Sequence, residues 1–278
     1  MTVEFVKMHG AGNDFVLLDD RDGRVPWQDR QRMAALAARR TGVGSEGILL
    51  VQRSARADFR MRFLNPDGAE AEFCCNGARC AAAFAHAIGA AGRTMTIETA
   101  CGLLDAELAD AGVRVWMPEP SGRRYHLDVA VGGRRVHGHF LCAGVPHFVV
   151  PVPDAGAVDV AGEGAALRRH ADFAPAGTNV SFAALRPPDG IRLRTFERGV
   201  EAESGACGTG AVAAAVAAVE TAGFTLPVRV RTSAGYEMVV DGERRGDRCT
   251  GLTLLGPAAV VFRGTVDLDA IVRTGEAE

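Results

Sequence analysis

Two stretches of the chain, CCNGARCAAAFAHAIGAAG at residues 74–92 and CGTGAVAAAVAAVETAG at residues 207–223, share one pattern. Each opens with Cys-x-x-Gly-Ala, continues as an alanine-rich run and reaches a glycine. Alanine favours helix, and glycine often follows a helix as its C-terminal cap. We therefore predict one helix at about residues 76–91, ending at Gly92, and another at about residues 209–222, ending at Gly223.

The two cysteines that open these stretches, Cys74 and Cys207, lie about half the chain apart. Alanine matches carry little weight, but a cysteine and a glycine at equal offsets carry more. The pattern indicates an internal repeat. It predicts two similar halves, each with a cysteine at the start of a buried helix.

The rest of the chain reads mainly as strands, marked by β-branched residues and alternating polarity. A third helix is expected at Trp27–Arg40 from its apolar spacing. The fold class predicted is α+β, with two pseudo-symmetric halves, each of strands wrapped around a central helix, and an active site in the cleft between them. The predicted halves are residues 1–118, joined by a C-terminal strand at 265–278, and residues 119–264. The strands are expected at residues 4–8, 15–18, 47–51, 59–64, 94–98, 112–117, 148–152, 179–185, 191–196, 228–232, 237–240 and 258–264.

The composition excludes several classes of protein. The 278 residues are 47% hydrophobic with a net charge of −3, so neither nucleic acid nor an anionic membrane is expected as a partner. The N-terminus has no signal-peptide pattern, which favours a cytoplasmic protein. The only lysine is Lys7, in a predicted strand, so a pyridoxal phosphate enzyme, which needs a Schiff-base lysine, is not expected.

Seven cysteines are present, an odd number in a chain of this length, and a disulfide framework is not expected. Three of them crowd together as C-C-x4-C, which lacks the C-x2-C spacing of a structural zinc site. No metal is predicted. We expect Cys80, Cys101, Cys142 and Cys249 to be buried as small apolar side chains.

A cysteine at a helix start lies in the positive field of that terminus, which favours the thiolate and is expected to lower the thiol pKa. First-turn N–H groups also bind carboxylates. Two such helix starts facing one another could hold an amino acid's carboxylate, with one sulfur on each face of Cα. Cys74 and Cys207 would then be the base and the acid of a racemisation, with coupled titrations.

Eight segments in order along the whole chain resemble the diaminopimelate epimerase family. They are KMHGAGNDF (7–15), GVGSEG (42–47), FLNPDG (63–68), NGARC (76–80), GVPH (144–147), GTNVSF (177–182), ERGV (197–200) and ACGTG (206–210). The resemblance implies conversion of LL-2,6-diaminopimelate to the meso form, for lysine and peptidoglycan precursors. It implies no cofactor, a homodimer, and Cys74 and Cys207 as the acid–base pair.

The resemblance also assigns substrate-binding residues. At the reacting carboxylate it implies Asn76 and the amides of Cys75, Gly208 and Thr209. At the distal zwitterion, Arg198 can fork a carboxylate while asparagines add hydrogen bonds. The remaining implied binding residues are Asn13, Asn65, Asn179 and Glu197, and His147 and Glu197 are implied to tune the cysteine pKa values.

Three positions depart from the family pattern. Cys75 stands where glycine is usual, Val145 where many members carry asparagine, and Ser204-Gly205 where Thr-Leu is commoner. These departures bear on the substrate more than on the reaction. A racemase of another amino acid on the same scaffold, and a non-catalytic or isomerase relative, remain alternatives.

Overall fold

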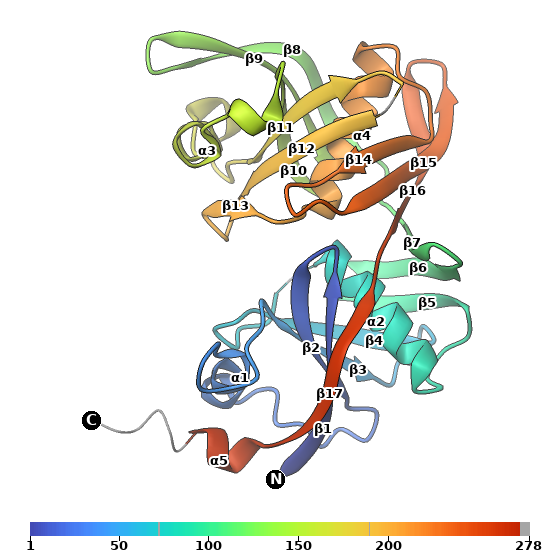
Figure 1. Cartoon of the computed structure of the whole chain (residues 1–278). Coiled ribbons are helices and arrows are strands. Elements are labelled where there is room, and N and C mark those ends of the chain that lie inside the picture. The colour runs from blue at the N-terminus through green and yellow to red at the C-terminus, as the bar shows by residue number, and fades with distance from the viewer. Residues whose placement is uncertain (72, 189, 273–278) are drawn as a thin grey trace. The chain divides into compact units, whose positions relative to one another are not determined.

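The computed structural model describes residues 1–71, 73–188 and 190–272. The chain forms two compact units (Figure 1). The first comprises Met1–Val115 together with the chain from Gly256 onward, and the second comprises Trp116–Leu255. Each unit is described by itself.

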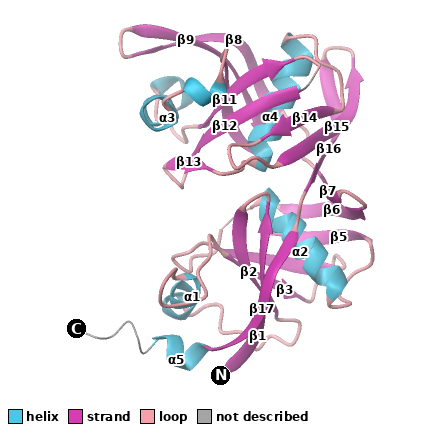
Figure 2. Ribbon diagram, in the orientation of Figure 1, coloured by secondary structure: helices cyan, strands magenta, loops and turns pink. Residues whose placement is uncertain are grey.

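The first unit consists of strands and helices (Figure 2). Its elements are β1 (Thr2–Gly10), β2 (Asn13–Asp19), α1 (Arg30–Ala37), β3 (Ile48–Gln52), β4 (Phe59–Leu64), α2 (Cys75–Ala87), β5 (Thr94–Thr99), β6 (Gly102–Ala109), β7 (Gly112–Trp116), β17 (Ala259–Asp267) and α5 (Leu268–Val272).

The second unit has the same kind of make-up. Its elements are β8 (Ser121–Val131), β9 (Arg134–Ala143), β10 (Val145–Pro151), the 3-10 turn η1 (Ala155–Ala157), α3 (Val160–Arg168), the 3-10 turn η2 (Ala171–Phe173), β11 (Asn179–Arg186), β12 (Gly190–Glu197), β13 (Ala202–Ser204), α4 (Gly208–Thr221), β14 (Val228–Arg231), β15 (Glu237–Arg245) and β16 (Arg248–Gly256).

Strand pairing follows the same scheme in both units. In the first, the order is β17-β1-β2-β3-β4-β5-β6-β7, and only β2–β3 and β4–β5 are parallel. In the second, the order is β8-β9-β10-β11-β12-β14-β15-β16, with β13 also on β12, and β10–β11 and β12–β14 are parallel. The parallel connections contain α1 and α2 in one unit and α3 and α4 in the other. The predicted α+β fold with two pseudo-symmetric halves is confirmed.

Each unit packs its strands around one helix. Helix α2 contacts β1, β2, β3, β4 and β6, and α4 contacts β9, β10, β11, β12, β14 and β15. The first twelve residues of α4 are all buried. Small alanine side chains let strands approach this helix on every side, which is why an alanine-rich sequence forms the centre of a sheet-wrapped unit.

The ends of the two central helices differ from prediction in one case. Gly223 follows α4 with φ of 73°, as predicted for a C-terminal cap. Helix α2 ends at Ala87 instead of near residue 91, because Gly89, with φ of 68°, stops it before Gly92 is reached. The third predicted helix is shorter too, with α1 covering only Arg30–Ala37.

The sequence reading missed β6, β8, β9, β13, β16, α3 and α5. The C-terminal strand expected at residues 265–278 is wrong over residues 268–272, because β17 ends at Asp267 and α5 follows it, and residues 273–278 lie outside the described residues. Strand β8, SGRRYHLDVAV, is mostly polar and partly exposed, so it lacks the apolar alternation that marks a strand. The compact units also divide after Val115 and after Leu255, whereas the sequence reading divides the chain after residues 118 and 264. The difference at the second boundary arises because β17 pairs with β1 along nearly its whole length.

Within the described residues, none of the helices is long and apolar enough to cross a membrane.

Candidate active site

Cys74 is the N-cap residue of α2. Its backbone is extended, with φ of −142° and ψ of 112°, and its sulfur accepts a hydrogen bond from the Gly77 amide at 3.4 Å. Cβ of Cys74 lies 3.5 Å from where a Cβ on Gly77 would be. A larger residue at position 77 would bring its side chain against the cysteine and Leu49. The Cys-x-x-Gly pattern therefore places a thiol over the first turn of its helix.

Two asparagines lie beside the Cys74 sulfur. Oδ1 of Asn13, at the start of β2, is 3.6 Å from Cys74 Sγ and accepts a hydrogen bond from Nδ2 of Asn76 at 3.3 Å. Asn13 also donates to Glu46. Oδ1 of Asn76 accepts from Nη2 of Arg79, one turn further along α2, at 2.7 Å. The sequence reading missed Glu46 and did not assign a role to Arg79.

Cys75 stands where the family pattern has glycine, and its side chain is directed into the protein. It is 4% exposed, and Nη1 of Arg79 lies 3.8 Å from its sulfur. Burial raises the pKa of the Cys75 thiol, against the opposing effect of the Arg79 charge. Cys75 is therefore a buried thiol packed on Arg79, and it does not project over the helix end as Cys74 does.

Cys207 is the N-cap residue of α4, with φ of −113° and ψ of 108°, close to the conformation of Cys74. It is 7% exposed, and its sulfur lies 3.5 Å from Oγ1 of Thr209. A Cβ on Gly210 would lie 3.2 Å from Cβ of Cys207, the counterpart of the contact at Gly77. The two cysteines thus occupy matching positions in the repeat, at helix ends whose first N–H groups have no intrahelical partner.

A chain of hydrogen bonds leads from Cys207 into the second unit. Thr209 Oγ1 is 2.9 Å from Nε2 of His147, whose Nδ1 is 3.2 Å from Oγ of Ser181. Ser181 in turn lies 3.2 Å from Oγ1 of Thr195. The structure thus connects His147 to Cys207 through Thr209. The sequence reading missed Ser181 and Thr195, which look like ordinary strand residues.

The pKa of the Cys207 thiol is raised, whereas the sequence predicts a lowered one. Burial raises its pKa well above the ordinary value, and the Glu197 carboxylate raises it further. Hydrogen bonds from Thr209 and the Gly210 amide act in the opposite direction but do not offset burial. The prediction that the helix start lowers the pKa is wrong for Cys207, because desolvation penalises a thiolate more than the helix end favours it. The direction of this shift favours the thiol form of Cys207.

His147 is fully buried, and burial together with the nearby Arg198 charge lowers its pKa to about 3. The unfolded chain binds a proton at this imidazole below its ordinary pKa near 6.5, while the folded protein does not. His147 therefore contributes stability that is complete above about pH 6.5 and declines as the pH falls toward 3.

Because of His147, we expect the free energy of unfolding to fall by about 2 kcal/mol as the pH is lowered from 6.5 to 5. Denaturant unfolding of His147→Asn should show a correspondingly flatter dependence on pH. Equal slopes for wild type and His147→Asn would contradict a neutral buried His147.

Asn179 and Arg198 are linked through the backbone. Asn179, at the start of β11, is 5% exposed; its Nδ2 donates to the Pro146 carbonyl at 2.9 Å and its Oδ1 accepts from the Arg198 N–H at 2.8 Å. Arg198 Nη1 donates to the Ala176 carbonyl at 3.4 Å. Glu197 precedes Arg198 and is hydrogen-bonded to Cys207. Asn179 thus fixes the turn that carries both charged residues.

The remaining predicted positions lie in loops. Asn65 is exposed in the turn after β4, where its backbone pairs with Gly68 and Ala69. The departure at Ser204-Gly205 is accommodated by the turn after β14, because Ser233 Oγ donates to both of their carbonyls, at 3.0 and 3.2 Å. The loop leading to Cys207 is therefore tied to the unit.

The other cysteines fall into two groups. Cys80 and Cys249 are buried, as predicted, and burial raises their pKa values to about 12 and about 11. Cys101 is exposed and Cys142 half-buried, so the prediction that both belong to the core is wrong for Cys101 and holds only in part for Cys142. Across the described ranges, no group of three or more His, Cys, Asp or Glu side chains could hold a metal ion.

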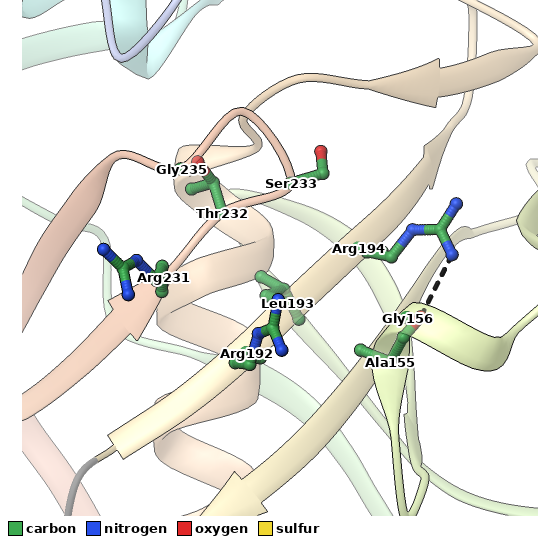
Figure 3. A pocket seen from close by; sticks show the side chains of 9 residues that line it. All are labelled: Ala155, Gly156, Arg192, Leu193, Arg194, Arg231, Thr232, Ser233 and Gly235. Carbon is green, nitrogen blue, oxygen red and sulfur yellow. Dashed lines mark hydrogen bonds between the residues drawn. The ribbon is translucent and has the colours of Figure 1, made fainter.

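A pocket of about 480 Å³ on the second unit is separate from these residues (Figure 3). Arg194 lies along one wall and donates to the Ala155 carbonyl at 3.0 Å, while Arg192 and Arg231 lie side by side on the paired strands β12 and β14. The thiols, asparagines and helix starts described above do not line it, so it is not the candidate active site.

The comparisons with known proteins agree on one family. A model of the family described as diaminopimelate epimerase matches residues 5–121 and 140–260. The chain belongs to the diaminopimelate epimerase family. The diaminopimelate epimerase of Aquifex aeolicus (strain VF5) is 40% identical, over 86% of this chain and 90% of the relative. That of Chlorobaculum tepidum (strain ATCC 49652 / DSM 12025 / NBRC 103806 / TLS) is 39% identical, over 94% of this chain and 100% of the relative.

The family predicted from the sequence is therefore confirmed, and the protein is an isomerase of the epimerase class. Solved structures share its fold at low identity. A phenazine biosynthesis protein of the PhzF family from Bacillus anthracis has a TM-score of 0.72 at 17% identity, covering 96% of this chain and 99% of that one. A hydroxyproline epimerase from Agrobacterium vitis has a TM-score of 0.70 at 18% identity, covering 96% and 93%.

Proposed function

We propose that this protein converts LL-2,6-diaminopimelate to the meso isomer without a cofactor, with Cys74 and Cys207 as its acid–base pair. The observation that carries the proposal is that both cysteines are the N-cap residues of the two equivalent central helices, each with a glycine three residues on. The family assignment supports the substrate. The product would supply lysine and peptidoglycan synthesis.

The reaction needs one base and one acid at a single Cα. Cys207 enters as the thiol, since burial and Glu197 raise its pKa. Cys74, as thiolate, then removes the Cα proton of the LL isomer. The electron pair of the broken C–H bond moves into the carboxylate, and Cys207 delivers its proton to the opposite face. The cycle ends with Cys74 as thiol and Cys207 as thiolate, and proton exchange with water restores the starting state.

The carboxylate must hold the developing negative charge, because no cofactor acts as an electron sink. We assign that stabilisation to first-turn amides of α2 and α4, including those of Cys75, Gly208 and Thr209, and to the Asn76 side chain. Arg198, with Asn13, Asn65, Asn179 and Glu197, would bind the distal zwitterion. His147 and Glu197 would tune Cys207, the first through Thr209 and the second by direct contact.

Incubation of the reduced protein with LL-diaminopimelate tests the substrate, with a panel of L-amino acids including L-lysine as comparison. Chiral chromatography should show meso-diaminopimelate and leave the panel unchanged. Racemisation of a panel member alone would assign the protein to the alternative, a racemase of another amino acid. Absence of any reaction would leave only the non-catalytic alternative.

The mechanism needs the Cys74 and Cys207 sulfurs on opposite faces of one Cα. Without substrate between them, mild oxidation should therefore join the two sulfurs in a disulfide. Treatment with diamide, which takes up the two electrons and two protons, should form a Cys74–Cys207 disulfide and abolish turnover. Dithiothreitol should restore activity. Peptide mapping by mass spectrometry identifies the bond, and full activity in protein shown to carry it would contradict the two-thiol mechanism.

We also place the enzyme in the cytoplasm, where thiols stay reduced, and expect a homodimer from the family resemblance. Analytical ultracentrifugation tests the second expectation.

A further inference from the structure

Arg79, in the second turn of α2, is a fully buried cation, with 0% of the residue exposed. Its guanidinium donates to three oxygens: Oδ1 of Asn76 at 2.7 Å and the carbonyls of Cys75 and Pro257, each at 3.4 Å. Among the residues that the structure describes, no carboxylate forms an ion pair with it. All its acceptors are neutral, and two of them belong to the residues that follow Cys74.

A buried charge without a counter-charge is costly, and proteins usually pair it. Arg62, in the same unit and 8% exposed, shows the usual arrangement, with an ion pair to Glu70 and its guanidinium over the Trp27 ring. Arg79 differs from Arg62 in having only neutral acceptors. A thiolate or a substrate carboxylate at the start of α2 would provide a negative charge on the side of Arg79 where Asn76 and Cys75 accept its hydrogen bonds.

The contact with Asn76 also fixes which way its amide points. Arginine only donates hydrogen bonds, so the atom of Asn76 that faces it must be the oxygen. Nδ2 is then on the other side of the amide, where it donates to Asn13 next to the Cys74 sulfur. A rotated amide would present an oxygen to an incoming carboxylate and repel it. Arg79 selects the orientation that binds an anion.

The segment after β16 holds the guanidinium in place. A Cβ on Gly256 would lie 3.0 Å from Nε of Arg79 and 3.1 Å from its Cζ, so the backbone of Gly256 packs directly on the guanidinium plane. The neighbouring Pro257 supplies the carbonyl acceptor. The position of Arg79 is therefore set from two sides, by its own helix and by this segment.

We propose that Arg79 is a positioning residue of the active site, which orients the Asn76 amide toward the substrate carboxylate and places an unneutralised positive charge behind the Cys74 end of α2. The inference rests on the proposed function, because it assigns the carboxylate to Asn76. The competing explanation is a purely structural role, in which Arg79 only ties α2 to the Gly256–Pro257 segment.

A double-mutant cycle separates the two explanations. Arg79→Met and Asn76→Ala should each lower kcat by about 10²-fold, the usual cost of one anion-stabilising donor. The double variant should lose clearly less than the product of the two single losses, because Arg79 orients Asn76, and the loss that remains on removing Arg79 from Asn76→Ala reports its charge behind Cys74. Arg62→Met is the matched control and should keep kcat. Additive losses, with the Arg79 effect unchanged in Asn76→Ala, would overturn the proposal.

A second readout does not depend on diaminopimelate. The rate of Cys74 alkylation by iodoacetamide, followed by peptide mass spectrometry across pH, reports how readily Cys74 forms a thiolate. Its midpoint should move to higher pH in Arg79→Met and stay at the wild-type value in Arg62→Met. Arg79→Lys keeps the charge but not the fork, so it should restore the midpoint while kcat stays about 10-fold low.

These outcomes also separate failure of the proposed function from failure of the proposed role of Arg79. A wild-type protein that leaves LL-diaminopimelate unchanged contradicts the proposed function, whereas the alkylation midpoint still tests Arg79. An unchanged midpoint in Arg79→Met contradicts the role of Arg79, whatever the substrate. If Arg79→Met fails to fold, Arg79→Lys is the test. The proposal predicts that Arg79→Lys lowers kcat but keeps the wild-type alkylation midpoint. A purely structural role predicts only a loss of stability.

Discussion

Replacement of Cys207 by alanine is expected to reduce formation of meso-diaminopimelate by about 10³-fold or more, the scale of losing a general acid or base. Cys207 provides the proton that inverts Cα, and Thr209, the hydroxyl nearest its sulfur, has no acidity that could replace it. Cys74→Ala should have the same effect from the opposite side. A chiral assay of product at saturating substrate measures both.

Two controls make this result specific to the pair. Cys142→Ser, at a half-buried cysteine of the same unit as Cys207, should retain full activity. The double variant Cys74→Ala/Cys207→Ala should be no slower than either single variant, since groups that act as a unit are lost together. Cys207→Ala with near wild-type turnover would show that another group supplies the proton.

Arg198→Ala should produce the second large effect, a fall of about 10²-fold in kcat/KM for LL-diaminopimelate, as expected for loss of a charge-assisted hydrogen-bond pair. The turn that carries Arg198 is held by Asn179, which accepts from the Arg198 N–H. Removal of the side chain leaves that backbone contact intact. The loss should therefore reflect substrate recognition, with only a small fall in thermal stability from the lost exposed hydrogen bond to the Ala176 carbonyl.

Arg192→Ala is the matched control, on strand β12, which ends one residue before Arg198. Arg192 is exposed beside Arg231 in the separate pocket, and its removal should leave kcat/KM unaltered (Figure 3). An Arg198→Ala enzyme with unchanged kcat/KM would exclude a substrate with a distal carboxylate and favour a racemase of another amino acid.

The features that the sequence predicts best are those encoded locally. The two central helices follow from alanine content. The N-cap positions of Cys74 and Cys207 follow from the Cys-x-x-Gly pattern, because a side chain at either glycine would lie against its cysteine, 3.5 Å from Cβ of Cys74 or 3.2 Å from Cβ of Cys207. The prediction for helix α2 is too long because the sequence offers two glycines, Gly89 and Gly92, as possible C-terminal caps. Only the backbone conformation shows that Gly89 ends the helix.

What the sequence reading missed depends on tertiary packing. The raised pKa of Cys207 follows from burial and from Glu197, the last residue of β12, whereas the helix start alone suggests the opposite direction. The hydroxyls of Ser181 and Thr195 meet His147 only once β10, β11 and β12 are paired. The spacing of Arg79 three residues after Asn76 was visible, but not its complete burial or its neutral acceptors.

The proposed mechanism gives each face of Cα its own thiol, and the early course of deuterium incorporation distinguishes this arrangement from a single base. Reduced protein would convert LL-diaminopimelate in D2O, with product and remaining substrate separated at low conversion and analysed by mass spectrometry. Two monoprotic thiols predict one deuterium in each meso molecule and almost none in the recovered LL isomer, because a different sulfur serves each face. Equal early labelling of substrate and product would mean that one base serves both faces, and would contradict the account.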